Sequence, residues 1–258
     1  MTATTPPLAL IPARAGSLRV PAKNIRLLQG HPLLAYTVAA ARRSGVFSRV
    51  VVSTDSPEIA DIAVRYGAEV PWLRPPELAG PLSRDIEWVR HALDTLEDAD
   101  RAKAFALLRP TSPLRSAASV TLAMQQFLAD PTADSLRAVE PCRQHPGKMW
   151  VLHGHDRMEP LLAQPGDGQP WHSTPYQALP AVYVQNAAME VAWVRTVREL
   201  GTIAGRTIRP FMLEGHEGHD LNDEADWWIL ERLLSEGRVT LPSPLPAEDP
   251  ASRRGTTA

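Results

Sequence analysis

The feature that most constrains the fold is a regular alternation of short apolar runs with longer amphipathic segments. Residues 8–11 (Leu-Ala-Leu-Ile) form the first apolar run, and Pro12 closes it, as expected of a buried strand. A helical pattern covers residues 32–44 and ends near Gly45. Strands that alternate with helices predict an α/β fold: a mostly parallel sheet with helices on both faces.

The alternation continues along most of the chain. We expect further strands at residues 49–53, 69–73, 104–108, 135–139, 181–184, 189–194 and 207–213. We expect further helices at residues 56–67, 84–96, 116–128 and 222–235. The dipeptide Ser56-Pro57 and the glycine at Gly67 are ordinary signals for the start and the end of a helix.

One segment breaks this rhythm. Residues 142–180 are rich in His, Gly, Pro and Gln and contain only short apolar runs. The segment is too long for an ordinary connection, so we interpret it as an inserted arm, either a lid or a part that packs on a second subunit. We expect one domain over residues 8–241, with disordered ends at residues 1–7 and 242–258.

Bulk properties exclude several classes of function. The formal net charge is -2 over 258 residues, which argues against a nonspecific grip on nucleic acid. The single cysteine, Cys142, cannot form an internal disulfide, which favours a reducing compartment. No signal peptide or apolar run of about 18 residues is recognisable, so we expect a cytoplasmic protein without a membrane partner.

The most informative segment is the loop after the first strand, residues 11–24 (IPARAGSLRVPAKN). Open α/β sheets bind ligands at this place, and a turn at Gly16 can direct backbone N–H groups toward an anion. The loop also carries three cations and one amide: Arg14, Arg19, Lys23 and Asn24. These features favour polyphosphate binding over a solvated basic loop, although no Gly-Lys-Ser/Thr follows as in a Walker A loop.

This loop resembles the N-terminal signature of the acylneuraminate cytidylyltransferases (CMP-sialic acid synthetases). Further segments match that family in the same order: residues 51–55 (VVSTD), 73–79 (LRPPELA), 110–115 (PTSPLR), 145–148 (HPGK), Asn186 in a Tyr-x-x-Asn context, and 220–227 (DLNDEADW). Together the matches extend over residues 8–234, nearly all of the part expected to fold.

The resemblance implies a Rossmann-like nucleotidyltransferase fold of the GT-A-like type, usually dimeric through an inserted arm. It also implies transfer of CMP from CTP to a small acidic, sugar-like acceptor of the nonulosonic-acid type, with release of pyrophosphate. The implied cofactor is Mg²⁺, for which Mn²⁺ can substitute. The expected partners are therefore CTP, the acceptor and a second copy of the chain.

The roles of individual residues are carried over from the same resemblance. Arg14 and Lys23 would be catalytic, holding the triphosphate and stabilising charge on the α-phosphate. The nucleotide-binding positions would be Ala13, Ala15, Gly16, Ser17, Arg19, Asn24, Arg74 and Ser83. The acceptor-binding positions would be Arg109, Thr111, Ser112, Lys148, Tyr176, Gln185 and Asn186. Asp220 and Asn222 would bind the metal.

The chain departs from the family pattern at four positions. Leu18 replaces a lysine, although Arg19 follows it, and Asn222 replaces the second metal-binding aspartate. Arg109 replaces a glutamine and Tyr176 an arginine near the acceptor. We therefore expect a related enzyme with a different acceptor. A sugar-1-phosphate or phosphonate nucleotidyltransferase and a catalytically impaired nucleotide-binding protein remain the alternatives.

Two of these positions have a competing structural interpretation. Asp220 and Asn222 stand two residues apart, so both side chains project from one face of an extended segment, but Asn222 or Asp223 could simply cap the last helix. We expect capping for Asp223. The fork of donors on Arg109 suits the anionic group of the acceptor, unless Arg109 pairs with an acid such as Glu140.

Overall fold

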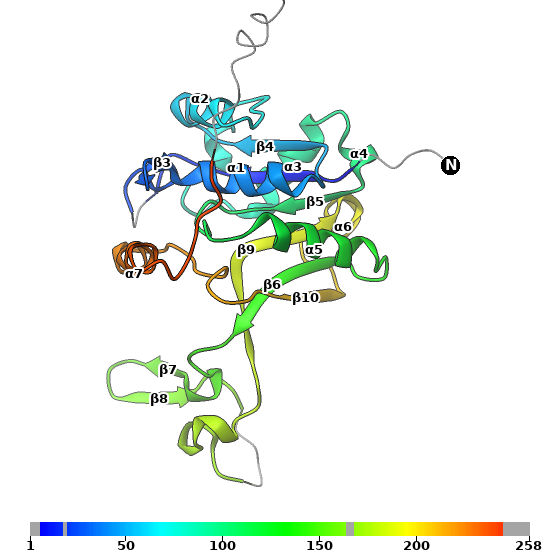
Figure 1. Ribbon diagram of the computed structural model, residues 1–258. Helices are drawn as coiled ribbons and strands as arrows, with labels where there is room; N and C mark the ends of the chain where they lie inside the picture. The colour runs from blue at the N-terminus through cyan, green and yellow to red at the C-terminus, as the bar shows by residue number, and fades with distance from the viewer. Residues whose placement is uncertain (1–5, 18–19, 164–167, 245–258) are drawn as a thin grey trace, which may run out of the picture. The chain divides into compact units, whose positions relative to one another are not determined.

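The structure is a computed structural model that describes residues 6–17, 20–163 and 168–244 (Figure 1). Leu18 and Arg19 lie outside the described residues, as do residues 1–5 and 245–258 of the ends expected to be disordered. The chain forms two compact units: residues 139–185 make up one, and the remainder makes up the other. We describe each unit by itself.

A six-stranded sheet forms the centre of the larger unit. Its strand order is β10 (Ile208–Met212), β6 (Ser135–Pro141), β9 (Tyr183–Trp193), β5 (Ala104–Leu107), β1 (Leu8–Pro12) and β4 (Arg49–Ser53). Strand β1 pairs in parallel with both β4 and β5, whereas β9 runs antiparallel to β5. The predicted α/β fold with a mostly parallel sheet is confirmed.

Helices cover both faces of this sheet. Seven α-helices occur among the described residues: α1 (Leu33–Ser44), α2 (Pro57–Arg65), α3 (Asp85–Thr95), α4 (Ala99–Ala102), α5 (Ala117–Leu128), α6 (Val194–Leu200) and α7 (Glu224–Ser235). In β1, Ala9 and Ile11 pack with α1, α2 and α5, while Leu8 and Leu10 pack with α3, α4 and α6. Successive side chains of β1, which is buried from Leu8 to Ile11, point to opposite faces of the sheet, so the core forms one layer on each face.

Helix α7 packs on a third, smaller cluster. Its residues Trp227 and Leu230 are buried against Leu33 and Tyr36 of α1 and against Leu114. Near this cluster, β2 (Leu27–Leu28) and β3 (His31–Pro32) form a two-stranded ribbon. No helix among the described residues is both long and apolar enough to cross a membrane.

Most helix boundaries follow the local signals in the sequence. Ser56 caps α2 by accepting a hydrogen bond from the Ile59 N–H at 3.3 Å. Gly45 ends α1 in the left-handed conformation, with φ of 67°. Asp223 caps α7 by accepting from the backbone N–H groups of Ala225 and Asp226, as expected.

Two expectations about the elements were wrong, and helices α4 and α6 were not expected. Residues 69–73 form a single bridge, between Glu69 and Val51, instead of a strand, because Pro71 has no N–H to donate to a ladder. The two strands expected at 181–184 and 189–194 are one strand, β9. Helix α6 was not foreseen, because its first residues are mostly β-branched and read as the end of a strand.

The smaller unit contains the interruption expected at residues 142–180 but is slightly longer, at 139–185. Its described residues, 139–163 and 168–185, include the antiparallel hairpin of β7 (Trp150–His153) and β8 (Arg157–Pro160) and three short 3₁₀ turns. Strand β6 leads into it and β9 leads out of it. We call residues 139–185 the arm.

A buried histidine joins the two ends of the arm. His145 accepts a hydrogen bond from the Gly147 N–H at its Nδ1, and its Nε2 lies 3.0 Å from the carbonyl of Pro180. A Cβ atom on Gly147 would lie 2.9 Å from the His145 ring and from Trp171. The motif at residues 145–148 therefore has a structural role within the arm. Only glycine at position 147 leaves room for His145 to bind the Pro180 carbonyl, 35 residues later in the chain.

Candidate active site

The site lies where the order of the strands reverses. From β1 the chain proceeds to β4 on one side and then crosses over to β5 on the other, so the carboxyl ends of β1 and β5 diverge. A cleft of about 530 Å³ opens at this point. It is lined by Pro12, Arg14, Ser17, Lys23, Asn24, Arg74, Leu78, Gly80, Pro81, Ser83, Asp85, Trp88, Arg109, Pro110 and Thr111.

The two residues expected to be catalytic both line this cleft, and each is oriented by a backbone carbonyl. The Arg14 Nη1 donates to the carbonyl of Gly80 at 2.5 Å. The Lys23 Nζ donates to the carbonyl of Leu221 at 2.8 Å. A backbone carbonyl carries no net charge, so these two hydrogen bonds orient the side chains of Arg14 and Lys23 without neutralising their charge.

The loop after β1, residues 11–24, was expected to form an anion nest from its backbone N–H groups, and we call it the phosphate loop. Its described backbone differs from that expectation. The Ala15 N–H donates to Asp55 Oδ1 at 2.9 Å, and the Ser17 N–H donates to the Ala15 carbonyl at 2.9 Å. Ala13 is buried, and its N–H extends the ladder to Ser53. These three amides therefore already have acceptors. A Cβ on Gly16 would meet no atom within 4 Å, so the space beside this glycine is open.

Arg74 and Asn24 line the cleft where the resemblance places the nucleoside. Arg74 is buried, donates to the hydroxyl and the carbonyl of Ser53, and lies over the ring of Trp88 at 4.8 Å. Burial lowers the pKa of Arg74 to about 10, so the guanidinium stays charged at neutral pH. Asn24 donates from Nδ2 to the Arg14 carbonyl at 3.0 Å, which fixes the loop.

The other residues expected to bind the nucleotide differ in whether they line the cleft. Ser17 and Ser83 line the cleft, and the Ser83 hydroxyl donates to the Glu77 carbonyl at 3.1 Å. Ala13, Ala15 and Gly16 are not among the residues that line it. Arg19 falls outside the described residues, so its proposed replacement of the family lysine stays a prediction.

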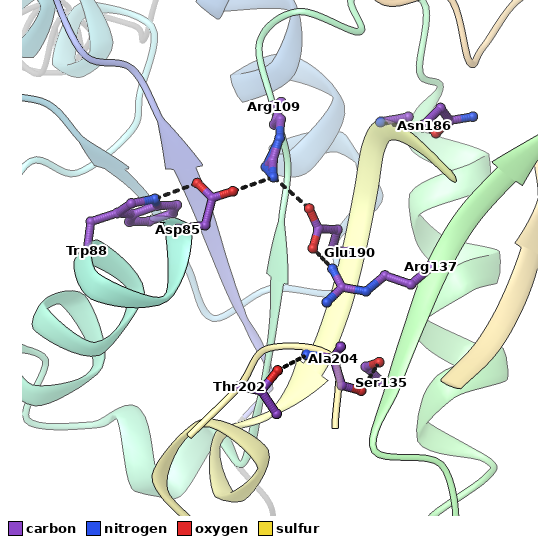
Figure 2. Close-up of polar contacts among 10 residues, drawn as sticks. Asp85, Trp88, Arg109, Ser135, Arg137, Asn186, Glu190, Thr202 and Ala204 are labelled. Atoms are coloured by element: carbon purple, nitrogen blue, oxygen red, sulfur yellow. Dashed lines mark hydrogen bonds and ion pairs between the residues drawn. The ribbon is translucent and has the colours of Figure 1, made fainter. Parts of the chain in front are cut away.

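Arg109 also lines the cleft, but its partners are two carboxylates (Figure 2). Its Nη2 lies 2.7 Å from Asp85 Oδ2 and 2.7 Å from Glu190 Oε1. The buried Glu190 forms a second ion pair, with Arg137. The expectation that Arg109 could pair with an acid is confirmed, but the partner named for it, Glu140, was wrong.

Sequence reasoning missed three residues of this region: Asp85, Trp88 and Glu190. Asp85 opens helix α3, and its position at a helix start made it look like an ordinary first-turn acid. Its Oδ1 accepts from the indole N–H of Trp88 at 2.8 Å. The usable signal was Glu190, because an acid within the apolar second half of strand β9, residues 187–193, needs a buried cation.

The loop after β5 is held by a buried arginine. Arg115 donates to the hydroxyl of Thr37 at 2.9 Å and to the carbonyls of Ala188 and Arg109. Burial lowers the pKa of Arg115 to about 9, which still leaves it charged at neutral pH. Thr111 lines the cleft, whereas Ser112, which is fully buried, and Asn186, which is partly buried, do not. A direct contact of these two with the acceptor stays a prediction.

The two expected metal ligands lie on a segment tied to the cleft. The Leu221 N–H donates to the Thr111 carbonyl at 2.8 Å, and the Leu221 carbonyl accepts from Lys23. Asn222 donates to Asp220 Oδ2 at 2.8 Å, whereas Asp220 Oδ1 is buried and has no hydrogen-bond partner in the described chain.

These residues fit a hard cation. A buried carboxylate oxygen with unused acceptor capacity is suited to Mg²⁺, and an amide oxygen is an accepted second ligand. The described residues contain no group of three His, Cys, Asp or Glu side chains that could hold a metal by themselves. Substrate phosphates and water would therefore have to complete the coordination, as is usual for Mg²⁺.

Three expected acceptor-binding residues belong to the arm: Lys148, Tyr176 and Gln185. Within the arm, Lys148 Nζ donates to the carbonyl of His172 at 3.3 Å, and the Tyr176 hydroxyl donates to the carbonyl of Cys142. Both side chains thus contribute to the fold of the arm. A contact with the acceptor stays a prediction for all three.

Comparison with known proteins specifies the class and the family of this α/β protein. The cytidylyltransferase family profile matches residues 8–131. The chain is 34% identical to the CMP-N,N'-diacetyllegionaminic acid synthase of Legionella pneumophila over 237 residues, which cover 91% of this chain and 98% of that protein. It is 33% identical to the pseudaminic acid cytidylyltransferase of Campylobacter jejuni, over 52% of this chain and 58% of that protein.

Among solved structures, a CMP:2-keto-3-deoxy-manno-octonic acid synthetase complexed with CTP has the same fold, with a TM-score of 0.64 and 15% identity. That similarity covers 90% of this chain and 100% of the other. The chain belongs to the cytidylyltransferase family that includes the N-acylneuraminate cytidylyltransferases, and it is a nucleotidyltransferase.

Proposed function

We propose that this protein transfers CMP from CTP to a nonulosonic acid and releases pyrophosphate in a Mg²⁺-dependent reaction. The observation that carries the proposal is the charge of the cleft. Arg14, Lys23 and Arg74 line it together, and neither arginine forms an ion pair within the described chain. Arginines left without a carboxylate partner in a cleft are suited to a polyphosphate.

The proposed reaction needs positioning more than covalent help. An acceptor hydroxyl oxygen forms a bond to the α-phosphorus of CTP, the bond to the β-phosphate bridging oxygen breaks, and the hydroxyl proton is lost to solvent. Arg14 and Lys23 would orient the triphosphate and stabilise the charge that develops on it. Asp220 and Asn222 would hold Mg²⁺, which supplies further charge neutralisation when bound.

The choice of acceptor class rests on the relatives. The similar proteins of Legionella pneumophila and Campylobacter jejuni are named for N,N'-diacetyllegionaminic acid and pseudaminic acid, and both names denote nonulosonic acids. The first similarity spans nearly the whole chain, including the arm. It therefore supports an acceptor of this class more strongly than a sugar 1-phosphate.

A panel of substrates tests the proposal. Pyrophosphate release would be measured with each of the four ribonucleoside triphosphates and with N,N'-diacetyllegionaminate, pseudaminate, N-acetylneuraminate or 2-keto-3-deoxy-manno-octonate as acceptor. We expect release only with CTP and at least one nonulosonic acid, and its loss on addition of a chelator. Release with sugar 1-phosphates alone would replace the proposal, and CTP binding without release would indicate an impaired enzyme.

We further propose that the arm joins two copies of the chain. Four of its apolar side chains, Trp150, Val151, Leu161 and Leu162, are 37 to 50% exposed in the isolated chain. Exposed apolar groups gathered on one inserted unit are typical of a protein interface. Light scattering at micromolar concentration should give twice the monomer mass of 28.3 kDa, and a monomer would contradict the proposal.

A further inference from the structure

Four charged side chains form a chain of ion pairs at one end of the cleft, and we call them the acceptor-end network: Asp85, Arg109, Glu190 and Arg137. They come from α3, from the loop after β5, from β9 and from β6. Two cations and two carboxylates give a net charge of zero. Glu190 and Arg137 are almost fully buried, and of the four only Asp85 and Arg109 line the cleft. Figure 2 shows the three ion pairs.

The ion pairs of the acceptor-end network leave Arg109 unable to bind the carboxylate of the acceptor. One nitrogen, Nη2, already serves both Asp85 and Glu190, and the other, Nη1, is buried. A two-point grip on an incoming carboxylate needs two accessible nitrogens. An anion brought to this place would also meet the negative charges of Asp85 and Glu190 at short range.

The exposed polar group of the network is instead the carboxylate of Asp85. Its side chain is 44% exposed, compared with 22% for Arg109 and 7% for Glu190. Each of its oxygens receives one protein donor, from Trp88 at Oδ1 and from Arg109 at Oδ2. Since a carboxylate oxygen has two lone pairs, each oxygen can accept one more hydrogen bond.

We propose that Asp85 is a specificity-determining residue that accepts a hydrogen bond from a donor-bearing substituent of the acceptor, a hydroxyl or an acylamino N–H. Arg109 acts behind it as a positioning residue that fixes the direction of the carboxylate. The inference rests on the proposed function for the identity of the acceptor. CTP also carries donors, the cytosine amino group and two ribose hydroxyls. We assign the acceptor to this carboxylate because Asp85 pairs directly with Arg109, one of the positions expected to bind the acceptor.

The test compares Asp85→Asn with Asp94→Asn, the same chemical change at an exposed position of the same helix. Binding of N,N'-diacetyllegionaminate to protein saturated with a nonhydrolysable CTP analogue would be measured by calorimetry. We expect Asp85→Asn to raise the acceptor Kd at least tenfold, with the CTP-analogue Kd changed less than twofold, because a hydrogen bond to a charged group is lost. Asp94→Asn should change neither.

An unchanged acceptor Kd in Asp85→Asn, or a loss confined to the CTP analogue, would overturn the assignment. Absence of acceptor binding to the wild-type protein would overturn it as well. A melting temperature of Asp85→Asn equal to that of wild type separates the binding effect from misfolding. The measurement needs no turnover, so a wild-type protein that binds the acceptor but releases no pyrophosphate would refute the proposed function and leave Asp85 testable.

Discussion

The two ends of the cleft use arginine in opposite ways. At the end proposed to bind the nucleotide and its phosphates, which we call the phosphate end, Arg14 and Arg74 donate to backbone carbonyls and to the hydroxyl of Ser53, so their charges remain available. At the acceptor end, Arg109 contacts two carboxylates, and its charge is balanced within the protein. The partner of an arginine therefore decides whether it receives an anionic ligand or holds another side chain in place.

The largest expected effect that tests this difference between the arginines is a loss of folding stability when Glu190 is removed. Glu190→Ala should lower the free energy of unfolding by about 3–5 kcal/mol, because it leaves the buried Arg137 without its carboxylate partner, while Arg109 keeps only Asp85. Urea denaturation would measure it. Glu97→Ala removes the same side chain from an exposed turn and should cost less than about 0.5 kcal/mol. Equal losses in the two variants would show that the acceptor-end network is not a structural unit.

The phosphate end should respond in turnover instead of stability. Arg14→Ala and Lys23→Ala should each lower kcat by roughly 10²- to 10³-fold, the scale for removing one preorganised donor, with little change in melting temperature. Steady-state assays with CTP would measure the loss. Arg43→Ala, at an exposed position of α1, is the matched control and should retain full turnover. Near-normal turnover of Lys23→Ala would remove it from the catalytic machinery.

Substitutions of Asp220 and Asn222, the two expected metal ligands, should have an intermediate effect on activity. Asp220→Ala should raise the Mg²⁺ concentration needed for half-maximal activity by about 10- to 100-fold, because Asp220 provides the buried oxygen without a partner. Asn222→Asp should be tolerated and should lower that concentration by adding a carboxylate. Metal titrations of pyrophosphate release would compare the two. Full activity of Asp220→Ala in the presence of a chelator would exclude the metal role.

The smallest effect concerns a carboxylate far from the cleft. Asp134 accepts from the N–H groups of Arg206 and Thr207, and these hydrogen bonds lower the pKa of Asp134 below its ordinary value of 3.8. The stabilisation is therefore present above about pH 4 and is lost as the pH falls through the lowered pKa. Asp134→Ala should be less stable than wild type at pH 7, and the difference should shrink toward pH 3. A constant difference over that range would contradict this account.

The sequence was sufficient for features that depend on neighbouring residues. The strand β4 at Arg49–Ser53, the cap at Ser56 and the cap at Asp223 were all predicted, because hydrophobic period and capping chemistry are local. The cations of the phosphate loop were recognised for the same reason, since they lie within ten residues of one another; phosphate binding there stays a prediction.

The acceptor-end network was not predictable in this way. Arg109 lies 24 residues from Asp85 and 81 residues from Glu190 along the chain, and only the sheet order brings them together. Sequence alone presents Arg109 as an arginine in place of the family glutamine, and that substitution favours an anion site. The buried carboxylates that cancel its charge become visible only in three dimensions.

The peptide of Leu221 has a consequence for how the site is made in the cell. It links the Thr111 loop to Lys23, yet it is among the last parts of the folded chain to be synthesised. A nascent chain released as far as residue 219 has every strand of the sheet but lacks the segment that orients Lys23 and carries Asp220.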